Sequence, residues 1–172
     1  MLAEERRQTI LELLQQSSIP ISAGTLASRF SVSRQVVVGD IALLRATGAE
    51  ITATPRGYVM QRSPAGLIRQ IACRHDAAGT EAELNSIVDQ GCTVLDVIVE
   101  HPVYGQITGS LQLANRYDVS LFMSRYVDAR PLSQLTNGIH LHTLSCPDEN
   151  AYHRVLAALK KQGFLLDNEE IG

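Results

Sequence analysis

The chain has 172 residues, of which 45% are hydrophobic and 19% are charged, and its formal net charge is −3. This composition provides enough apolar material for a core and excludes an intrinsically disordered chain. No apolar run approaches the ~20 residues that a membrane helix needs, and the charged first residues lack the apolar segment of a secretory signal. We therefore expect a cytoplasmic protein of one or two domains, with no membrane partner.

Charges and histidines are unevenly distributed along the chain. Residues 1–63 carry seven Arg and five acidic residues, whereas the remainder carries eight basic residues, thirteen acidic residues and all five His. The three cysteines are scattered and include no CxxC pair, which supports neither a disulfide framework nor a thiolate zinc site and predicts buried, reduced thiols. A mildly basic first part and an acidic second part favour two domains with different roles.

The first part has the pattern of three helices followed by a β-hairpin. Ser22 and Ser33 are placed to cap the second and third helices, and Gly48 is placed to end the third. The predicted elements are helices over 3–17, 23–30 and 34–47, a tight turn at 31–32, and a strand-turn-strand over 50–60 with its turn at 55–57. This order predicts a winged helix-turn-helix domain over residues 1–63.

The third helix is the expected recognition helix. Its buried stripe is Val37, Ile41 and Leu44, spaced i, i+4, i+7. Arg can pair with guanine and Gln with adenine in the major groove, and an Arg at the wing can reach a phosphate or the minor groove. We therefore expect contacts to double-stranded DNA from the start of this helix, its opposite stripe and the wing, namely Ser33, Arg34, Gln35, Val38, Arg45 and Arg56. The alternative is a three-helix module for dimerisation or protein contacts.

The run Leu26–Val36 resembles the winged helix-turn-helix of biotin-operon-type bacterial regulators. Two residues depart from that pattern. Ser31 stands where the family often has Gly for a left-handed turn. Gly39 lies inside the recognition helix, where it costs about 1 kcal/mol of helix propensity.

The second part mixes strands and helices after a boundary at Ser63–Gly66. The predicted elements are strands over 67–74, 93–101 and 139–145 and helices over 80–90, 118–128 and 148–162, with 104–113 ambiguous. The fold class is therefore α+β, in which the winged helix-turn-helix is followed by a small α/β layered domain over residues 64–172.

Histidines in the second part have the spacing of metal ligands. Alternation along a strand places His140 and His142 on one face, about 6.6 Å apart. On one continuous helix His75 and Glu83 would lie about 12 Å apart, too far for one ion. Because Gly79–Thr80 interrupts that segment, the two side chains can still converge. The alternatives are a capping box of Thr80 with Glu83 and purely structural histidines.

The second part also resembles the three-histidine domain, the sensor of the nicotinate-responsive repressors of NAD biosynthesis and niacin uptake. The resemblance to these repressors runs along the whole chain, and its matching segments are Arg34–Val38, Ala53–Tyr58, Glu100–Gly105 and Gly138–His142. The resemblance implies a first-row divalent metal held by three histidines and one glutamate, which match His75, Glu83, His140 and His142 here. Such a donor set suits Ni, Zn, Co or Fe, and the sequence does not choose among them.

From this resemblance we expect a homodimeric repressor that uses nicotinate as co-repressor and binds a palindromic DNA operator. His101 and Tyr104 either line the effector pocket or end a strand. The alternatives are a regulator that responds to the metal itself or to another small molecule, and a small metal-dependent hydrolase. We expect no enzyme, because no Gly-rich phosphate loop and no Ser-His-Asp or Cys-His arrangement stands out.

Overall fold

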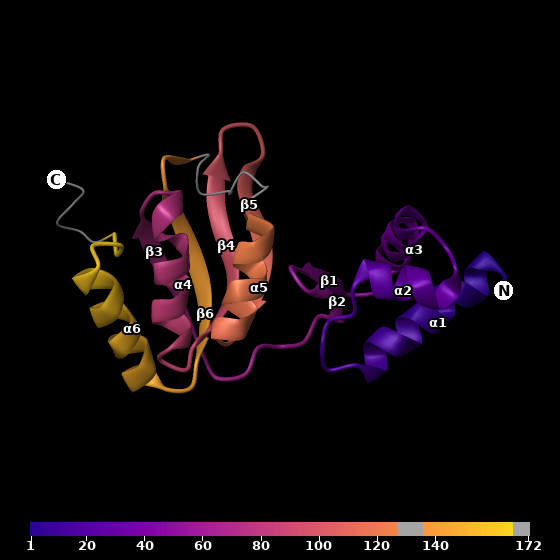
Figure 1. The fold of residues 1–172 in the computed structure, drawn as a ribbon, viewed down its shortest axis with the longest axis horizontal. Coiled ribbons are helices and arrows are strands. Elements are labelled where there is room, and N and C mark those ends of the chain that lie inside the picture. The colour runs from indigo at the N-terminus through magenta and orange to yellow at the C-terminus, as the bar shows by residue number, and fades with distance from the viewer. Residues whose placement is uncertain (127–135, 167–172) are drawn as a thin grey trace. The chain divides into compact units, whose positions relative to one another are not determined.

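The computed structural model describes residues 1–126 and 136–166, and the chain divides into two compact units, residues 1–63 and 64–172 (Figure 1). Within the described ranges, no helix is both long enough and apolar enough to cross a bilayer. The two units are described separately below.

The first unit is a winged helix-turn-helix, as the sequence predicts. Its elements are α1 (Ala3–Gln16), α2 (Ala23–Phe30), α3 (Arg34–Ala46) and the antiparallel strands β1 (Ile51–Thr54) and β2 (Gly57–Met60). The Ser22 and Ser33 hydroxyls accept hydrogen bonds from the backbone N–H groups of Thr25 and Val36, and so cap α2 and α3. Ser31 adopts the left-handed conformation, with φ 53°, in the turn where the related regulators often have Gly.

The core of the first unit joins all three helices. Fully buried side chains come from one face of each helix, namely Ile10, Leu14, Leu26, Val37 and Ile41. A partly buried ion pair joins α1 to α3: the Nε of Arg6 donates to the carboxylate of Asp40 over 2.6 Å. The ion pair therefore fixes α1 against the inner face of the expected recognition helix.

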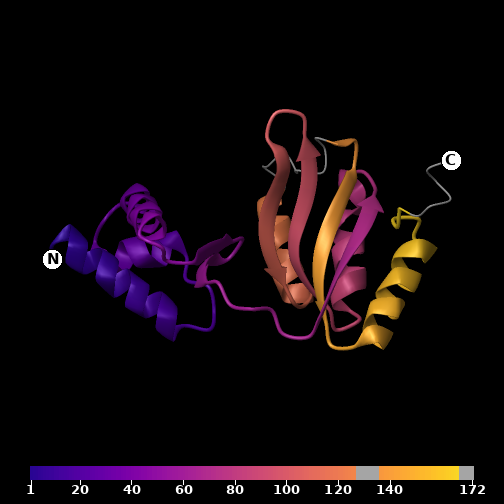
Figure 2. The same cartoon turned by 180° about the vertical axis from the view of Figure 1, so that it is seen from behind.

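The second unit is a two-layer α/β structure. Its elements are β3 (Leu67–Arg74), the 3₁₀ turn η1 (Ala77–Gly79), α4 (Thr80–Val88), β4 (Thr93–His101), β5 (Gly105–Leu113), α5 (Arg116–Tyr126), β6 (Ile139–Cys146) and α6 (Glu149–Lys161). The strands form one antiparallel sheet in the order β3-β6-β4-β5. Figure 1 shows α4, α5 and α6 on one face of this sheet, and in Figure 2 no helix of the described residues covers the opposite face.

Two segments differ from the sequence prediction for local reasons, and helix α4 ends at Val88, two residues earlier than predicted. The ambiguous segment 104–113 is the strand β5, whose alternation is weakened by glycines at 105 and 109. Helix α5 begins earlier than predicted because the side chain of Asn115 accepts the backbone N–H of Asp118 and acts as a cap. The last two residues of the predicted helix, 127–128, lie outside the described residues.

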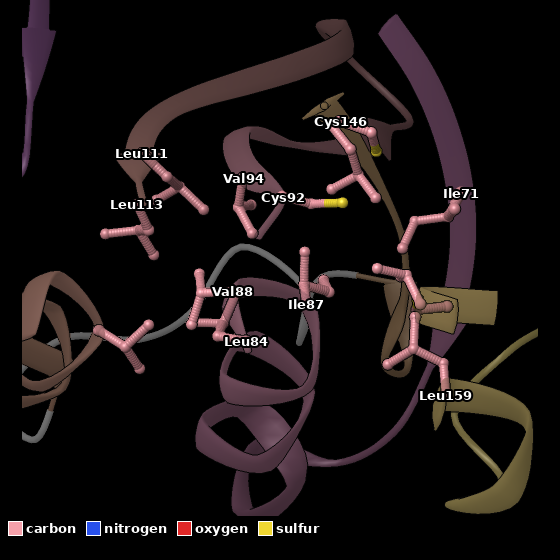
Figure 3. Close-up of a cluster of buried hydrophobic side chains, with 14 of the residues drawn as sticks. Ile71, Leu84, Ile87, Val88, Cys92, Val94, Leu111, Leu113, Cys146 and Leu159 are labelled. Carbon is pink, nitrogen blue, oxygen red and sulfur yellow. The ribbon is translucent and has the colours of Figure 1, made fainter. Parts of the chain in front are cut away.

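The core of the second unit lies between the sheet and its helices. Buried apolar side chains point inward from the strands and from α4 and α6, among them Leu84, Ile87, Val94, Leu113 and Leu159 (Figure 3). Alternate residues of β6 face this layer, so the register that buries Leu144 also turns His142 and His140 inward. The buried polar cluster described next is therefore part of the same interior layer.

Candidate metal centre and DNA-binding surface

The structure brings together the four side chains that the sequence singled out as metal ligands. His140 and His142 lie on the inward face of β6, His75 follows the end of β3, and Glu83 lies in the first turn of α4. The short η1 segment between β3 and α4 turns the chain back, which is why His75 and Glu83 converge as expected. All four side chains are at most 4% exposed.

Three imidazoles point at one carboxylate. The Nε2 atoms of His75 and His140 lie 2.5 and 2.8 Å from Oε2 of Glu83, and the Nε2 of His142 lies 2.5 Å from Oε1. The ring of His140 lies between the other two rings, with centroid separations of 4.8 Å on both sides. Three nitrogens and two oxygens therefore surround one small buried volume.

The other nitrogen of each ring is held by the backbone. The Nδ1 atoms of His75, His140 and His142 lie 2.6, 2.8 and 2.7 Å from the carbonyl oxygens of Asp76, Gly138 and Asp96. A carbonyl oxygen only accepts hydrogen bonds, so each Nδ1 carries the proton. In a neutral imidazole with its proton on Nδ1, the Nε2 atom has a free lone pair. This tautomer binds a metal through Nε2.

These contacts fit a cation at the centre of the cluster. Three lone pairs facing a carboxylate would repel it, because both sides are acceptors. Two states relieve this repulsion: the imidazoles take up a second proton, or a metal ion lies between the nitrogens and the carboxylate. Three imidazoles and one carboxylate are donors that suit Ni, Zn, Co or Fe.

Without a metal, the cluster behaves as a set of coupled ion pairs. Burial lowers the pKa of His142, but the charge of Glu83 and its hydrogen bond outweigh burial and raise the pKa above its ordinary value. Burial likewise lowers the pKa of His75, but its hydrogen bond with Glu83 and the charge of Glu83 outweigh burial, so this pKa is also raised. Burial raises the pKa of Glu83, yet the charge of His142 and the hydrogen bonds of the three rings hold it well below its ordinary value.

The alternative capping role of Glu83 is wrong. Helix α4 has Gly79 at its N-cap position, with no side-chain cap, and Thr80 is the first helical residue. The Thr80 hydroxyl instead pairs with the phenol of Tyr126 over 2.9 Å, while Glu83 is engaged by the three imidazoles. A capping box needs the hydroxyl residue one position earlier, so the sequence match was accidental.

One residue near the cluster was not singled out from the sequence. Cys73 lies on β3, directly opposite His140 on β6, and is fully buried. Its Sγ, a carboxylate oxygen of Glu83 and a ring nitrogen of His140 all lie within 4.8 Å of one another. The alternation of β3, which places Cys73 two residues before His75, is the signal that would have indicated this position.

A cavity of about 340 Å³ lies beside His140. Its lining comes from β4, β5, β6 and Thr136, and consists of Ile98, Val99, Glu100, Gln106, Thr136, Ile139, His140 and Leu141. We call it the β4–β6 cavity. Its volume falls within the range of small-molecule sites, and its wall is mainly apolar with a few polar groups.

His101 and Tyr104, the residues expected at the effector pocket, lie in the β4–β5 hairpin. The Nδ1 of His101 accepts the backbone N–H groups of Val103 and Tyr104, and the two rings lie 5.1 Å apart. Tyr104 is 76% exposed, and neither residue is among the described residues that line the β4–β6 cavity. Through these two hydrogen bonds, His101 stabilises the turn that follows β4.

Four of the six expected DNA-contacting residues form one exposed surface. Ser33, Arg34, Gln35 and Val38 lie at the start and on the outer side of α3 and are exposed, whereas Val37 is fully buried. Gly39 has open space around its Cα, so a Cβ there would meet nothing within 4 Å. This end of α3 is free of covering protein within the first unit, as a helix entering the major groove requires.

Of the other two expected residues, Arg45 lies in the last turn of α3 and Arg56 lies in the wing. The Nε of Arg45 donates to the carbonyl oxygen of Ile51 over 2.9 Å, and its guanidinium lies 5.9 Å from the centroid of the Tyr58 ring. Arg45 therefore joins the end of α3 to the base of the hairpin. Arg56 lies in the β1–β2 turn and is half-buried, with its backbone N–H donated to Thr54.

Comparisons with known proteins agree with this two-part architecture. A helix-turn-helix domain family matches residues 6–59, and the 3H domain family matches residues 68–168. The chain is 43% identical to the probable transcription repressor NiaR of Thermotoga maritima, over 95% of both chains. It is 44% identical to the transcription repressor NadR of Bacillus subtilis, over 96% of both chains.

A helix-turn-helix unit joined to a 3H domain defines a class of DNA-binding transcription repressors, and the hydrolase alternative is thereby set aside. The chain belongs to the family of 3H-domain transcription repressors that includes NiaR and NadR. The buried cluster at Glu83 lies in its 3H domain and has donors that could hold a metal.

Proposed function

We propose that this repressor controls genes of NAD biosynthesis and niacin uptake, with nicotinate as co-repressor and a first-row divalent metal in the 3H domain. The metal ligands are His75, Glu83, His140 and His142. The single observation that carries the proposal is the convergence of three Nε2 atoms on the Glu83 carboxylate, with every Nδ1 bonded to a carbonyl. The nicotinate assignment rests on the resemblance of the sequence to nicotinate-responsive repressors.

The β4–β6 cavity is the proposed effector site. It reaches His140, so an effector there lies next to the metal centre. The apolar wall suits a pyridine ring, and the side-chain amide of Gln106 offers a donor to a carboxylate. Binding and DNA affinity are coupled if nicotinate prefers the form of the protein that fits the operator. That His101 and Tyr104 line the effector pocket stays a prediction.

The DNA-binding role is assigned to α3 and the wing. Arg34 and Gln35 read base edges, Ser33 and Val38 contact the groove beside them, and Arg56 contacts the backbone or the minor groove. One winged unit covers a short half-site, so a homodimer on a palindromic operator supplies the affinity of a repressor. Chromosomal DNA as the partner requires a cytoplasmic protein. Light scattering of the purified protein, with and without operator, measures the number of copies.

Metal and effector are tested directly on the full chain. We expect protein purified without chelator to contain about one metal ion per chain, and the Glu83→Gln variant, which keeps the size of the side chain, to lose it. Thermal shift with nicotinate, nicotinamide and quinolinate then identifies the effector, because a ligand that binds only the folded state raises Tm. A shift with another compound but not with nicotinate would favour the alternative of a different small-molecule sensor. A shift with the metal, to which none of the three compounds adds a further shift, would favour a metal sensor.

A further inference from the structure

The thiol of Cys73 lies next to the proposed metal ligands Glu83 and His140. In the antiparallel pairing of β3 with β6, Cys73 is the direct partner of His140, and both side chains face the interior layer. The thiol, the Glu83 carboxylate and the His140 ring lie within 4.8 Å of one another, and all three residues are at most 3% exposed. Two donors of one ion, a sulfur and a nitrogen, lie at most about 4.4 Å apart. The observed spacing therefore needs only small shifts to place all three on one ion.

Within residues 1–126 and 136–166, neither of the other two cysteines joins a carboxylate and an imidazole in such a cluster. Cys92 and Cys146 lie together in the apolar core, beside Ile87 and Val94, at the other end of β4 and β6 (Figure 3). They are equally buried, so burial alone does not distinguish Cys73. Cys73 differs from them because a carboxylate and an imidazole lie next to it, and both are metal-binding groups.

We propose that Cys73 supplies a sulfur donor to the metal centre, beside His75, Glu83, His140 and His142. The inference rests on the proposed metal site. The thiol gives its proton to solvent as the sulfur binds. A set of three nitrogens, one carboxylate oxygen and one sulfur disfavours Mg, Ca and Mn and leaves Ni, Co, Zn or Fe. Five protein donors also leave one position of an octahedral ion for a small ligand.

The test uses the full chain loaded with Co²⁺. X-ray absorption of the wild-type protein should show a sulfur neighbour at about 2.3 Å, and the near-ultraviolet spectrum should show a sulfur-to-cobalt charge-transfer band. Cys73→Ser should lose both signals and bind Co²⁺ about 10- to 100-fold more weakly. Cys92→Ala, which removes an equally buried thiol away from the cluster, should keep both signals.

The outcomes separate the sulfur donor from the metal site itself. A wild-type protein with only nitrogen and oxygen neighbours would overturn the role of Cys73 and leave the four-ligand site intact. An unchanged charge-transfer band in Cys73→Ser would overturn it as well. If Glu83→Gln and His140→Ala bind Co²⁺ as tightly as wild type, the proposed metal site fails, and the sulfur donor fails with it. Because the wild-type measurement needs no substitution, the folding of the variants does not decide the result.

Discussion

Gly138 and His75 lie so close together that no side chain fits between them. A Cβ on Gly138 would overlap with the carbonyl oxygen of His75, and the backbone of Gly138 has φ +88°, which favours glycine. The carbonyl oxygen of Gly138 also accepts the Nδ1–H of His140 over 2.8 Å. One glycine therefore positions two of the proposed metal ligands.

Gly138→Ala should damage the metal centre and the stability of the 3H domain together. We expect metal content to fall at least about tenfold and Tm to fall by about 5–10 °C, because the left-handed backbone is strained by a Cβ and His75 must move. Metal analysis and thermal unfolding measure the two effects. Gly105→Ala is the matched control, since Gly105 has φ +72° but open space around its Cα. Equal losses of metal in the two variants would contradict the positioning role of Gly138.

Arg34→Ala and Gln35→Ala should each weaken operator binding about tenfold without changing stability. Both side chains are exposed at the start of α3, and a lost bidentate base contact costs about 1–3 kcal/mol. Fluorescence anisotropy with specific and scrambled DNA separates loss of base contacts from loss of charge. Arg116→Ala removes an exposed charge from the second unit, where Arg116 pairs with Asp89, and serves as the control. Operator affinity that falls equally in Arg116→Ala would show that only net charge matters.

Arg56→Ala should weaken binding to all DNA sequences to a similar extent. A phosphate contact at the wing carries no base information, so specificity stays while the dependence of log Kd on log salt becomes shallower by about one unit. The measurement is a salt titration of operator and nonspecific DNA. A loss confined to the operator would instead assign Arg56 a base-reading role in the minor groove.

The pH dependence of stability should change sign when the metal is removed. Without metal, His75 and His142 have a pKa above the ordinary 6.5, so their contribution is complete below 6.5 and is lost as pH rises through the raised values. Glu83, with a pKa well below the ordinary 4.5, contributes above 4.5 and loses this only as pH falls through its lowered value. Chelator-treated protein should therefore have a lower Tm at about pH 8 than at about pH 6.

Metal-loaded protein should show the opposite trend over the same interval. Protons compete with the metal for the imidazoles, so metal binding and its stabilisation grow as pH rises. Thermal unfolding of paired samples measures both trends. Identical pH profiles with and without chelator would contradict a metal at this cluster.

The three thiols should be unreactive in the folded, metal-free protein. All three are fully buried, and burial together with Cys146 raises the pKa of Cys92 to about 12. Since the thiolate is the reactive form, a disulfide reagent at about pH 8 should find no thiol in the native chain and all three in denaturant. Rapid reaction of one thiol under native conditions would show that its surroundings open.

Local signals predicted most elements of both units from the sequence. Ser22, Ser33 and Gly48 marked the limits of the helices in the first unit, and strand alternation gave the inward direction of His140 and His142. Such signals depend on neighbours in the chain, so they are present in the sequence itself. The convergence of His75 with Glu83 was also foreseeable, because a glycine interrupts the segment between them.

Features that depend on contacts between distant segments were not predictable. The strand order β3-β6-β4-β5 places Cys73 beside His140, 67 positions later in the sequence. The carbonyl of Asp96, which receives Nδ1–H of His142, becomes available because the pairing of β4 with β6 shifts register there. The ion pair of Arg6 with Asp40 likewise arises only when α1 packs on α3. The spacing of residues along the sequence does not predict these three contacts.

Operator binding measured by fluorescence anisotropy tests the central claim most directly. The DNA is the region upstream of the organism's own niacin and NAD genes, and the metal-loaded protein is titrated at fixed salt with and without saturating nicotinate. We expect nicotinate to strengthen specific binding at least about tenfold, nicotinamide to have no comparable effect, and Glu83→Gln to lose the enhancement. An operator Kd that nicotinate leaves unchanged or raises would contradict the co-repressor account.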